Sequence, residues 1–379
     1  LRALANYVIA FCFPFGQPFG VYHDDFAISR SWFDPPSTAF ALASIAAFAL
    51  TAFLLRRRAP LVVAGTAWFL VCHALESSVF PLELYFEHRN YLASVGLVLI
   101  AASAAGWTRN RLADAHDPGA LADSTPARTG LGFLLAVLAG LTFVESSIWA
   151  SDHSLYRSAV ERHPRSLRAN TDLAAWLSAN GRFGEARSLL AGLSQDADPE
   201  TRRVAALYSI TLHCAQREIP PPALFDTVRE AAPRTITMNQ LYAFRGALMQ
   251  IVEPGPCRSV PGDSLLRAAD TYLDSSKQPD TTISVWGLRH EYGLALAQTG
   301  RSEDARAQLE RALRDSGGNA EIAELLAAVL IQLGEIARAE AILTDALSAL
   351  PASNRAMRAR IETLLRSISR TGLRNTPAQ

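Results

Sequence analysis

Four long, predominantly apolar runs in the first 150 residues constrain this chain more than any other feature. They cover Ser37–Leu55, Pro60–Phe80, Tyr91–Trp107 and Gly130–Trp149, and Leu1–Phe15 has the composition of a fifth. A helix needs about 20 apolar residues to cross the roughly 30 Å hydrocarbon core of a bilayer. Buried helices of a soluble protein are the alternative, but four such runs leave no polar face for water. We therefore predict a transmembrane domain over residues 1–150.

The composition of the whole chain hides a difference between its two halves. Apolar residues make up 49% and charged residues 19% of the 379 positions, and the charged ones gather after residue 150. The net charge is zero, so no overall field favours nucleic acid, and we expect no nucleic-acid partner. Because Leu1 already lies inside an apolar run, we expect further sequence upstream of it.

Arginine placement predicts the orientation of the helices. Three arginines, Arg56–Arg58, fill the short turn between the first two complete spans. Arg109, Arg111 and Arg128 lie in the segment 108–129, two spans later. Short loops rich in arginine stay on the cytoplasmic side of a bacterial inner membrane. The segments 21–36 and 81–90, and everything after Ala150, are therefore predicted to face the periplasm.

A dense group of ionisable and aromatic residues follows the second complete span. Charged groups at membrane depth are costly, so they usually line a cavity or pair with one another. An arginine and a histidine together can hold a phosphate, and a nearby carboxylate can transfer a proton. The alternative is that Glu87 pairs with Arg89 and only fixes the loop. The candidate lipid-phosphate and substrate-binding residues are Glu76, Glu83, Glu87, His88, Arg89 and Tyr91.

A second outward segment carries one imidazole and two adjacent carboxylates, His23, Asp24 and Asp25. These residue types bind divalent metals when they converge at set distances. Solvated loop residues are the alternative interpretation. If the segment is functional, it faces the same compartment as Glu87, and a divalent metal is a candidate cofactor.

The four cysteines divide between the two halves of the chain. Cys12 and Cys72 lie in apolar segments, where a thiol behaves as a small hydrophobic group. Cys214 and Cys257 lie in the part predicted to be periplasmic, where disulfides persist. We predict that Cys214 and Cys257 pair.

The C-terminal part repeats with a period of 34 residues. Gly300, Ala305, Leu309 and Ala312 recur as Gly334, Ala339, Leu343 and Ala346, and a third copy begins near Leu173 and contains Gly181 and Ala186. A glycine turn, a small alanine and large apolar residues at this spacing are typical of stacked helix hairpins of the tetratricopeptide type. The fold class is therefore all-α, a transmembrane helix bundle followed by a tetratricopeptide-repeat α-solenoid.

Two degenerate helix pairs separate the clear copies. They are predicted at Arg202–Gln216 with Ala223–Ala232 and at Asn239–Val252 with Gly262–Ser275. A polar helix over Asn354–Ser369, rich in arginine, is expected to cap the array. The repeat domain thus covers 151–370, and residues 371–379 are expected to be a disordered tail.

The segments Leu75–Ser78, Pro81–Glu83 and Glu87–Ser94, together with Trp149–Asp152, carry a resemblance. The chain resembles bacterial membrane proteins with tetratricopeptide repeats and, more distantly, the transmembrane and tetratricopeptide-repeat O-mannosyltransferases of the GT-C type. Ala93 stands where that family has proline. The resemblance implies a polyprenyl-phosphate-linked sugar as donor, with Glu87, His88 and Arg89 at the lipid phosphate. It also implies a catalytic carboxylate upstream of Leu1, so we assign none here.

Three functions follow from these observations. The first is a glycosyltransferase that acts on an envelope protein or glycan at the outer face, with the repeats holding the acceptor. The second is a non-catalytic, membrane-tethered scaffold whose repeats bind envelope proteins. The third is a polymerase, ligase or transporter of envelope polysaccharide. Membrane lipid is a partner in all of them.

Overall fold

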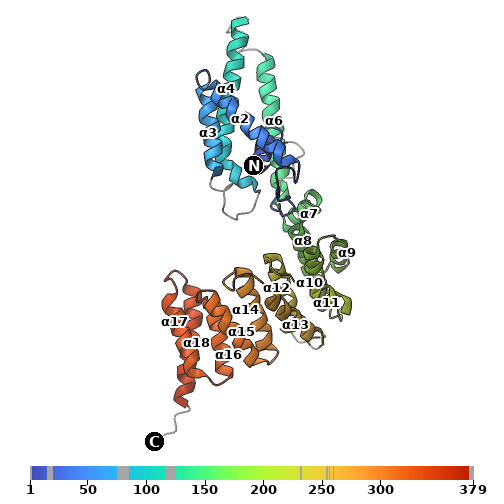
Figure 1. Cartoon of the computed structure of the whole chain (residues 1–379), viewed down its shortest axis with the longest axis vertical. Coiled ribbons are helices and arrows are strands. Elements are labelled where there is room, and N and C mark those ends of the chain that lie inside the picture. Colours follow the sequence, from blue (N-terminus) through green and yellow to red (C-terminus); the bar gives the residue numbers. More distant parts are fainter. Residues whose placement is uncertain are drawn as a thin grey trace. The chain divides into compact units, whose positions relative to one another are not determined.

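Figure 1 shows the computed structural model of the chain. Helices account for all the regular structure in its described part. The structure describes residues 2–14, 20–74, 85–115, 125–230, 233–252, 255, 257–258 and 260–374. These residues form seventeen α-helices and one short 3-10 helix, and they contain no β-strand, as the all-α prediction requires. They group into two compact units, Leu1–Trp176 and Leu177–Gln379.

The first unit begins with apolar helices. They are α1 (Arg2–Cys12), α2 (Ser37–Leu55), α3 (Pro60–Ala74), α4 (Asn90–Ala115) and α6 (Thr125–Ile148). Among the described residues, three segments of these helices are long and apolar enough to cross a membrane: Ser37–Leu55, Asn90–Thr108 and Thr129–Ile148. The span predicted over 60–80 is described only as far as Ala74, and residues 75–84 lie outside the described residues.

Helices α4 and α6 run further than the apolar spans predicted for them. The sequence assigned 108–129 to a loop, but α4 continues to Ala115 and α6 starts at Thr125. The one proline in these continuations, Pro126, lies in the first turn of α6, where its missing N–H costs nothing. It is therefore compatible with the helix. Within the continuation of α4, the guanidinium of Arg111 lies 5.2 Å from the centre of the Trp107 ring.

Two glycines bring α3 and α4 into close contact. A Cβ added at Gly65 would overlap with the carbonyl oxygen of Gly96, and a Cβ at Gly96 would overlap with that of Gly65. Small residues permit such an approach between apolar helices, which otherwise gain little from burying side chains in lipid. Around this contact the first unit has a buried cluster that includes Tyr7, Phe69 and Leu97.

The first unit also contains the first hairpin of the C-terminal part. Ser151 caps α7 (Asp152–Arg162), and α8 (Leu167–Ala179) follows. Arg162 donates two hydrogen bonds of 2.8 Å to the carboxylate of Glu145, which joins α7 to the end of α6. The two compact units meet inside α8, between Trp176 and Leu177.

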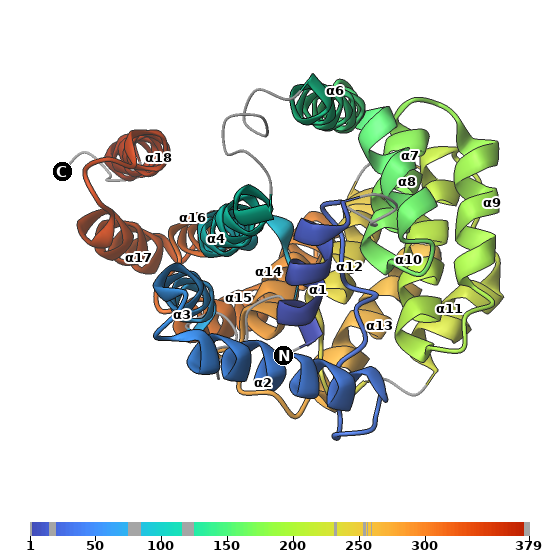
Figure 2. The same ribbon diagram turned by 90° about the horizontal axis from the view of Figure 1, so that it is seen from above.

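The second unit is a row of helix hairpins. Its helices are α9 (Phe183–Leu193), α10 (Pro199–Ala215), α11 (Pro222–Arg229), α12 (Met238–Val252), α13 (Val260–Ser275), α14 (Ile283–Gln298), α15 (Ser302–Asp315), α16 (Ala320–Gln332), α17 (Ile336–Ala349) and α18 (Arg355–Arg374). The first helices of successive hairpins, α10, α12, α14 and α16, contact one another in sequence. Figure 2 shows α10, α12 and α14 on the inner side of this curved row and α11 and α13 on its outer side.

The 34-residue repeat is confirmed by the positions of its marker residues. Gly300 and Gly334 end first helices with φ of 84° and 79°, a left-handed conformation that glycine adopts at no steric cost. Ala305 and Ala339 are fully buried in the following helices, as are Leu309 and Leu343 at the repeat's large apolar position. A tetratricopeptide-type solenoid is thus the fold of this unit.

The arginines of the predicted cap hold α18 in place. Arg358 donates hydrogen bonds of 3.0 Å to the carbonyls of Leu347 and Leu350 at the end of α17, and Arg360 pairs with Glu324 of α16. The sequence predicted this helix to end at Ser369. Instead α18 continues to Arg374, into the segment 371–379 that the sequence predicts as a disordered tail. Residues 375–379 lie outside the described residues.

Candidate functional site

A continuous series of aromatic and histidine rings occupies one end of the first unit. We call Tyr7, His23, His73, Tyr85 and His163 the ring cluster. Tyr7 stacks between His73 and Tyr85, with ring centres 4.9 and 4.8 Å away. His23 then meets Tyr85 and His163 edge-on, at 4.7 Å each. The cluster therefore connects α3 to the corner between α7 and α8.

Hydrogen bonds hold the segment that precedes α4 against this cluster. The hydroxyl of Tyr7 donates to the carbonyl of Phe86 and accepts from its N–H, at 2.9 Å each. His73 is almost fully buried, and its Nε2 lies 3.4 Å from Oδ1 of Asn90. The segment before α4 is thus held against α1 through Tyr7 and against α3 through His73.

The predicted phosphate-binding residues lie at the edge of this arrangement. Glu76 and Glu83 fall outside the described residues, and Glu87 starts the 3-10 helix η1 (Glu87–Arg89). His88 and Arg89 both lie beside the ring of Phe86, at 4.8 and 5.7 Å from its centre. Tyr91 is 84% exposed on α4.

The residues His23, Asp24 and Asp25 are brought to the α7–α8 corner, and with Tyr22 we call them the clamp loop. The carboxylate of Asp24 accepts hydrogen bonds from the Ser166 hydroxyl and from the N–H of Arg168. Nδ1 of the buried His163 lies 3.1 Å from the Asp25 carboxylate. These contacts attach the loop to the first hairpin. Within the described ranges, no three residues among His, Cys, Asp and Glu are placed to hold a metal ion.

Tyr22 completes the attachment. Its hydroxyl donates a hydrogen bond of 2.5 Å to Asp172, and its side chain packs with Ala159 and Ala169. Burial, together with the hydrogen bond and the charge of Asp172, raises the pKa of Tyr22 well above its usual range. The sequence indicated the polar clamp loop but not its partners. Nothing in the sequence around His163, Ser166 and Asp172 indicates that they contact a loop so far away in the chain.

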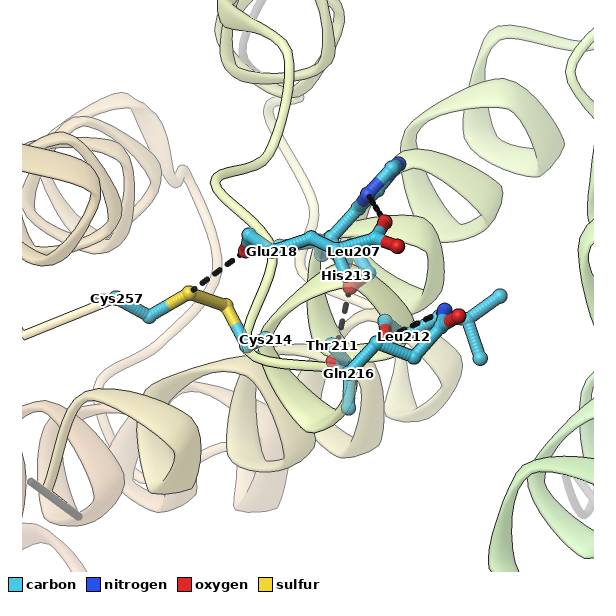
Figure 3. The surroundings of a disulfide bond; sticks show 8 residues. All are labelled: Leu207, Thr211, Leu212, His213, Cys214, Gln216, Glu218 and Cys257. Carbon is cyan, nitrogen blue, oxygen red and sulfur yellow. Dashed lines mark hydrogen bonds and ion pairs between the residues drawn. A yellow bond between two sulfur atoms is a disulfide. The ribbon is translucent and has the colours of Figure 1, made fainter. Parts of the chain in front are cut away.

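In the second unit, Cys214 and Cys257 form a disulfide (Figure 3). These are the two cysteines for which the sequence predicts a pair. The bond joins the last turn of α10 to the turn before α13, and the two Cα atoms lie 5.8 Å apart. Close to it, Nδ1 of His213 lies 2.9 Å from the Glu218 carboxylate, which also pairs with Arg187 of α9. The remaining thiols, Cys12 and Cys72, are free.

The inner side of the solenoid carries a concentration of exposed apolar groups. The residues Met238, Tyr242, Arg245 and Met249 follow one another at intervals of four, three and four, so they share one face of α12. We call these four residues the α12 ridge. Met238, Tyr242 and Met249 are 39%, 54% and 42% exposed. In the described part of this unit the other exposed large apolar residues are Ile283, at the start of α14, and Ile219.

A comparison with protein-family models supports the repeat assignment. A family model described as tetratricopeptide repeat matches residues 296–361. A solved structure, a thermophilic tetratricopeptide-repeat protein of Thermus thermophilus, is 22% identical and covers 53% of this chain and 99% of its own, with a TM-score of 0.33. No curated protein sequence matches.

Proposed function

We propose that this chain is a membrane-anchored scaffold whose tetratricopeptide-type repeats bind a partner protein. The observation that carries the proposal is the α12 ridge. Exposed apolar side chains normally occur singly on a soluble domain, and a concentration of them marks an interaction surface. Stacked helix hairpins provide an extended concave surface of the kind that binds other proteins. The proposed anchor consists of the apolar helices α2, α4 and α6 together with the span predicted over 60–80, which begins with α3.

The proposed location of the repeats is the extracytoplasmic side of the membrane. The arginines of the turn Arg56–Arg58 favour the cytoplasm for that turn, which puts the end of α6 on the opposite side. The disulfide between Cys214 and Cys257 agrees with this orientation, because disulfides persist in oxidising compartments. The two arguments use different residues and lead to the same side.

Site-directed photocrosslinking in cells of the source organism tests the scaffold. A photoreactive phenylalanine analogue replaces Tyr208, Tyr242 or Leu325 on first helices, or Arg267 or Arg311 on second helices. We expect discrete protein adducts, identified by mass spectrometry, from at least one of the first-helix positions. The second-helix positions should give none. If no position gives a protein adduct, or if both sets give the same adducts, the scaffold proposal is wrong.

Glycosyl transfer from a polyprenyl-phosphate carrier is the second candidate function. One observation favours it: a histidine and an arginine, His88 and Arg89, both lie against the ring of Phe86. The test compares envelope glycans by mass spectrometry in a deletion strain complemented with wild type or with Arg89→Ala. A glycan that returns only with wild type supports transfer. An unchanged glycan profile in the deletion strain removes this candidate.

A further inference from the structure

The α12 ridge is flanked by a second apolar face on α14. Ile283, Trp286, His290 and Leu294 lie at intervals of three and four, and each is exposed or half-buried. The two helices approach closely where Gly287 packs on Leu241, since a Cβ at Gly287 would lie 2.8 Å from Cδ2 of that leucine. Tyr242 and Trp286 are the direct chain neighbours of these contact residues. The two exposed faces thus lie on helices in direct contact, and together we call them the α12–α14 surface.

The exposed charge on this surface is positive. Neither α12 nor α14 contains a carboxylate apart from Glu291, which is buried. Nε of Arg245 lies 3.5 Å from Oε1 of Glu291, yet 63% of the arginine side chain is exposed. Arg245 is thus a cation in the middle of an apolar ridge. It has one carboxylate partner beneath it, while its outer side faces solvent.

The side chains of the ridge are suited to an adaptable contact. The whole chain has three methionines, and two of them, Met238 and Met249, are at the ends of the ridge. Methionine is flexible and polarisable, and it is over-represented on surfaces that adapt to several partners. From Met238 to Met249 the ridge is about 16 Å long at 1.5 Å per residue, which is three turns of a facing helix.

From this surface we infer the chemistry of the partner: the inner face of α12 and α14 binds the apolar side of an amphipathic helix that carries a carboxylate opposite Arg245. An amphipathic helix presents apolar anchors every three to four residues, the same spacing as the ridge. A carboxylate on it meets the exposed side of the guanidinium, whereas a lysine there would be repelled. This inference rests on the proposed scaffold function and makes it specific.

A peptide-display selection on the full chain in nanodiscs tests the inference. The probe is a library of random 16-residue peptides, selected on wild type, Arg245→Glu, Arg245→Gln, Tyr242→Asp and the control Ile219→Asp. Ile219 is a matched control because it is 71% exposed and lies outside α12 and α14. Wild type and the control should enrich helical apolar patterns with Asp or Glu. Arg245→Glu should enrich Lys or Arg instead, and Arg245→Gln should lose the preference.

One selected peptide is then measured by fluorescence anisotropy. We expect at least tenfold weaker binding to Tyr242→Asp and Arg245→Glu, with binding to Ile219→Asp unchanged. Equal binding to all variants, or enriched peptides without an acidic preference, overturns the inference. Two further outcomes also overturn it: a Tyr242-dependent dimer in mass photometry, which makes a second copy the occupant, and Tyr242-dependent binding of peptide-free anionic vesicles.

The two proposals fail separately. If photocrosslinks form at Tyr208 or Leu325 while the selection returns no acidic helices, the scaffold stands and the inferred partner chemistry is wrong. If no protein crosslinks form from any first-helix position, the scaffold itself fails.

Discussion

Asp198 illustrates how one side chain sets the start of a helix. Its carboxylate accepts hydrogen bonds from the N–H and the hydroxyl of Thr201, at 2.9 and 3.0 Å, and so caps α10. Burial acts to raise the pKa of Asp198, but these hydrogen bonds and the charge of Arg203 outweigh it, so the pKa lies below its usual value. A lowered pKa stabilises the fold above the unfolded-state pKa of about 3.9.

We predict that Asp198→Ala lowers the free energy of unfolding of the repeat unit by about 1 kcal/mol at pH 7. The part of this effect that depends on charge disappears as the pH falls through the folded-state pKa, because the protonated carboxyl no longer attracts the helix terminus. Hydrogen exchange of α10 at pH 7 and at pH 3 measures both parts. Asp198→Asn, which keeps the cap without charge, should show the smaller loss at pH 7. An equal effect of Asp198→Ala at both pH values contradicts the prediction.

Contacts between distant residues explain what sequence reasoning missed. The cap of Asp198 is local, so its residue type and its position before Pro199 indicate it. The bond between Asp24 and Ser166 crosses 142 positions, and that between Tyr22 and Asp172 crosses 150. No single-sequence pattern relates such positions. The loop was therefore recognised as polar, while its role in binding the α7–α8 corner was not.

Among the helices, the contact between α3 and α4 depends on the absence of two side chains. We predict that Gly96→Val separates these helices, because the new side chain would overlap with the backbone of Gly65, which cannot move cheaply. The measurement uses cysteines introduced at Thr66 and Leu97 in protein held in nanodiscs. Their rate of disulfide crosslinking should fall at least tenfold in Gly96→Val.

A glycine on another apolar helix provides the control for this change. Gly132 of α6 has no neighbour within 4 Å of an added Cβ. Gly132→Val should therefore leave the crosslinking rate unchanged. If both valine variants slow crosslinking equally, the effect comes from bulk in the membrane and not from the α3–α4 contact.

The disulfide links two hairpins across 43 positions. Loop closure of this size stabilises a fold by about 2–4 kcal/mol through the unfolded chain. We predict that reductant lowers the hydrogen-exchange protection of α10 and α13, and that Cys214→Ser/Cys257→Ser shows the same lowered protection with no response to reductant. Cys12→Ser, which removes a free thiol, should behave as wild type. A response of the double serine variant to reductant would refute this assignment of the effect.

The helices show where local sequence suffices. The repeat was predictable because Gly300, Ala305 and Leu309 act within one hairpin, and their copies 34 residues later do the same. Helix ends were harder to predict, since α4 continues into the segment 108–129 predicted as a loop and α18 continues past Ser369. The α12 ridge also escaped prediction, because an exposed Met238 or Tyr242 has the same spacing as a core residue.

For the whole molecule, the arginine pattern predicts sidedness. Alkaline phosphatase, which is active only outside the cytoplasm, should be active when fused after Gln379 and inactive when inserted between Arg56 and Arg58. A fluorescent reporter that matures only in the cytoplasm should show the reverse. Replacing Arg56, Arg57 and Arg58 by asparagine should reduce this asymmetry, because short arginine-rich loops are what retains a turn inside. The opposite reporter pattern would place the repeats in the cytoplasm.

The clamp loop also imposes an order on biosynthesis. Residues 22–25 emerge from the ribosome early, but their partners at 163–172 are made only after the last apolar helix has been completed. Until then Asp24 and Asp25 lack the partners that they have in the finished chain, and Tyr22 lacks Ala159 and Ala169 to pack on. The clamp loop can therefore reach its bound state only after the first hairpin has been made. A fragment that begins at residue 151 would lack the part of the chain that closes its first hairpin.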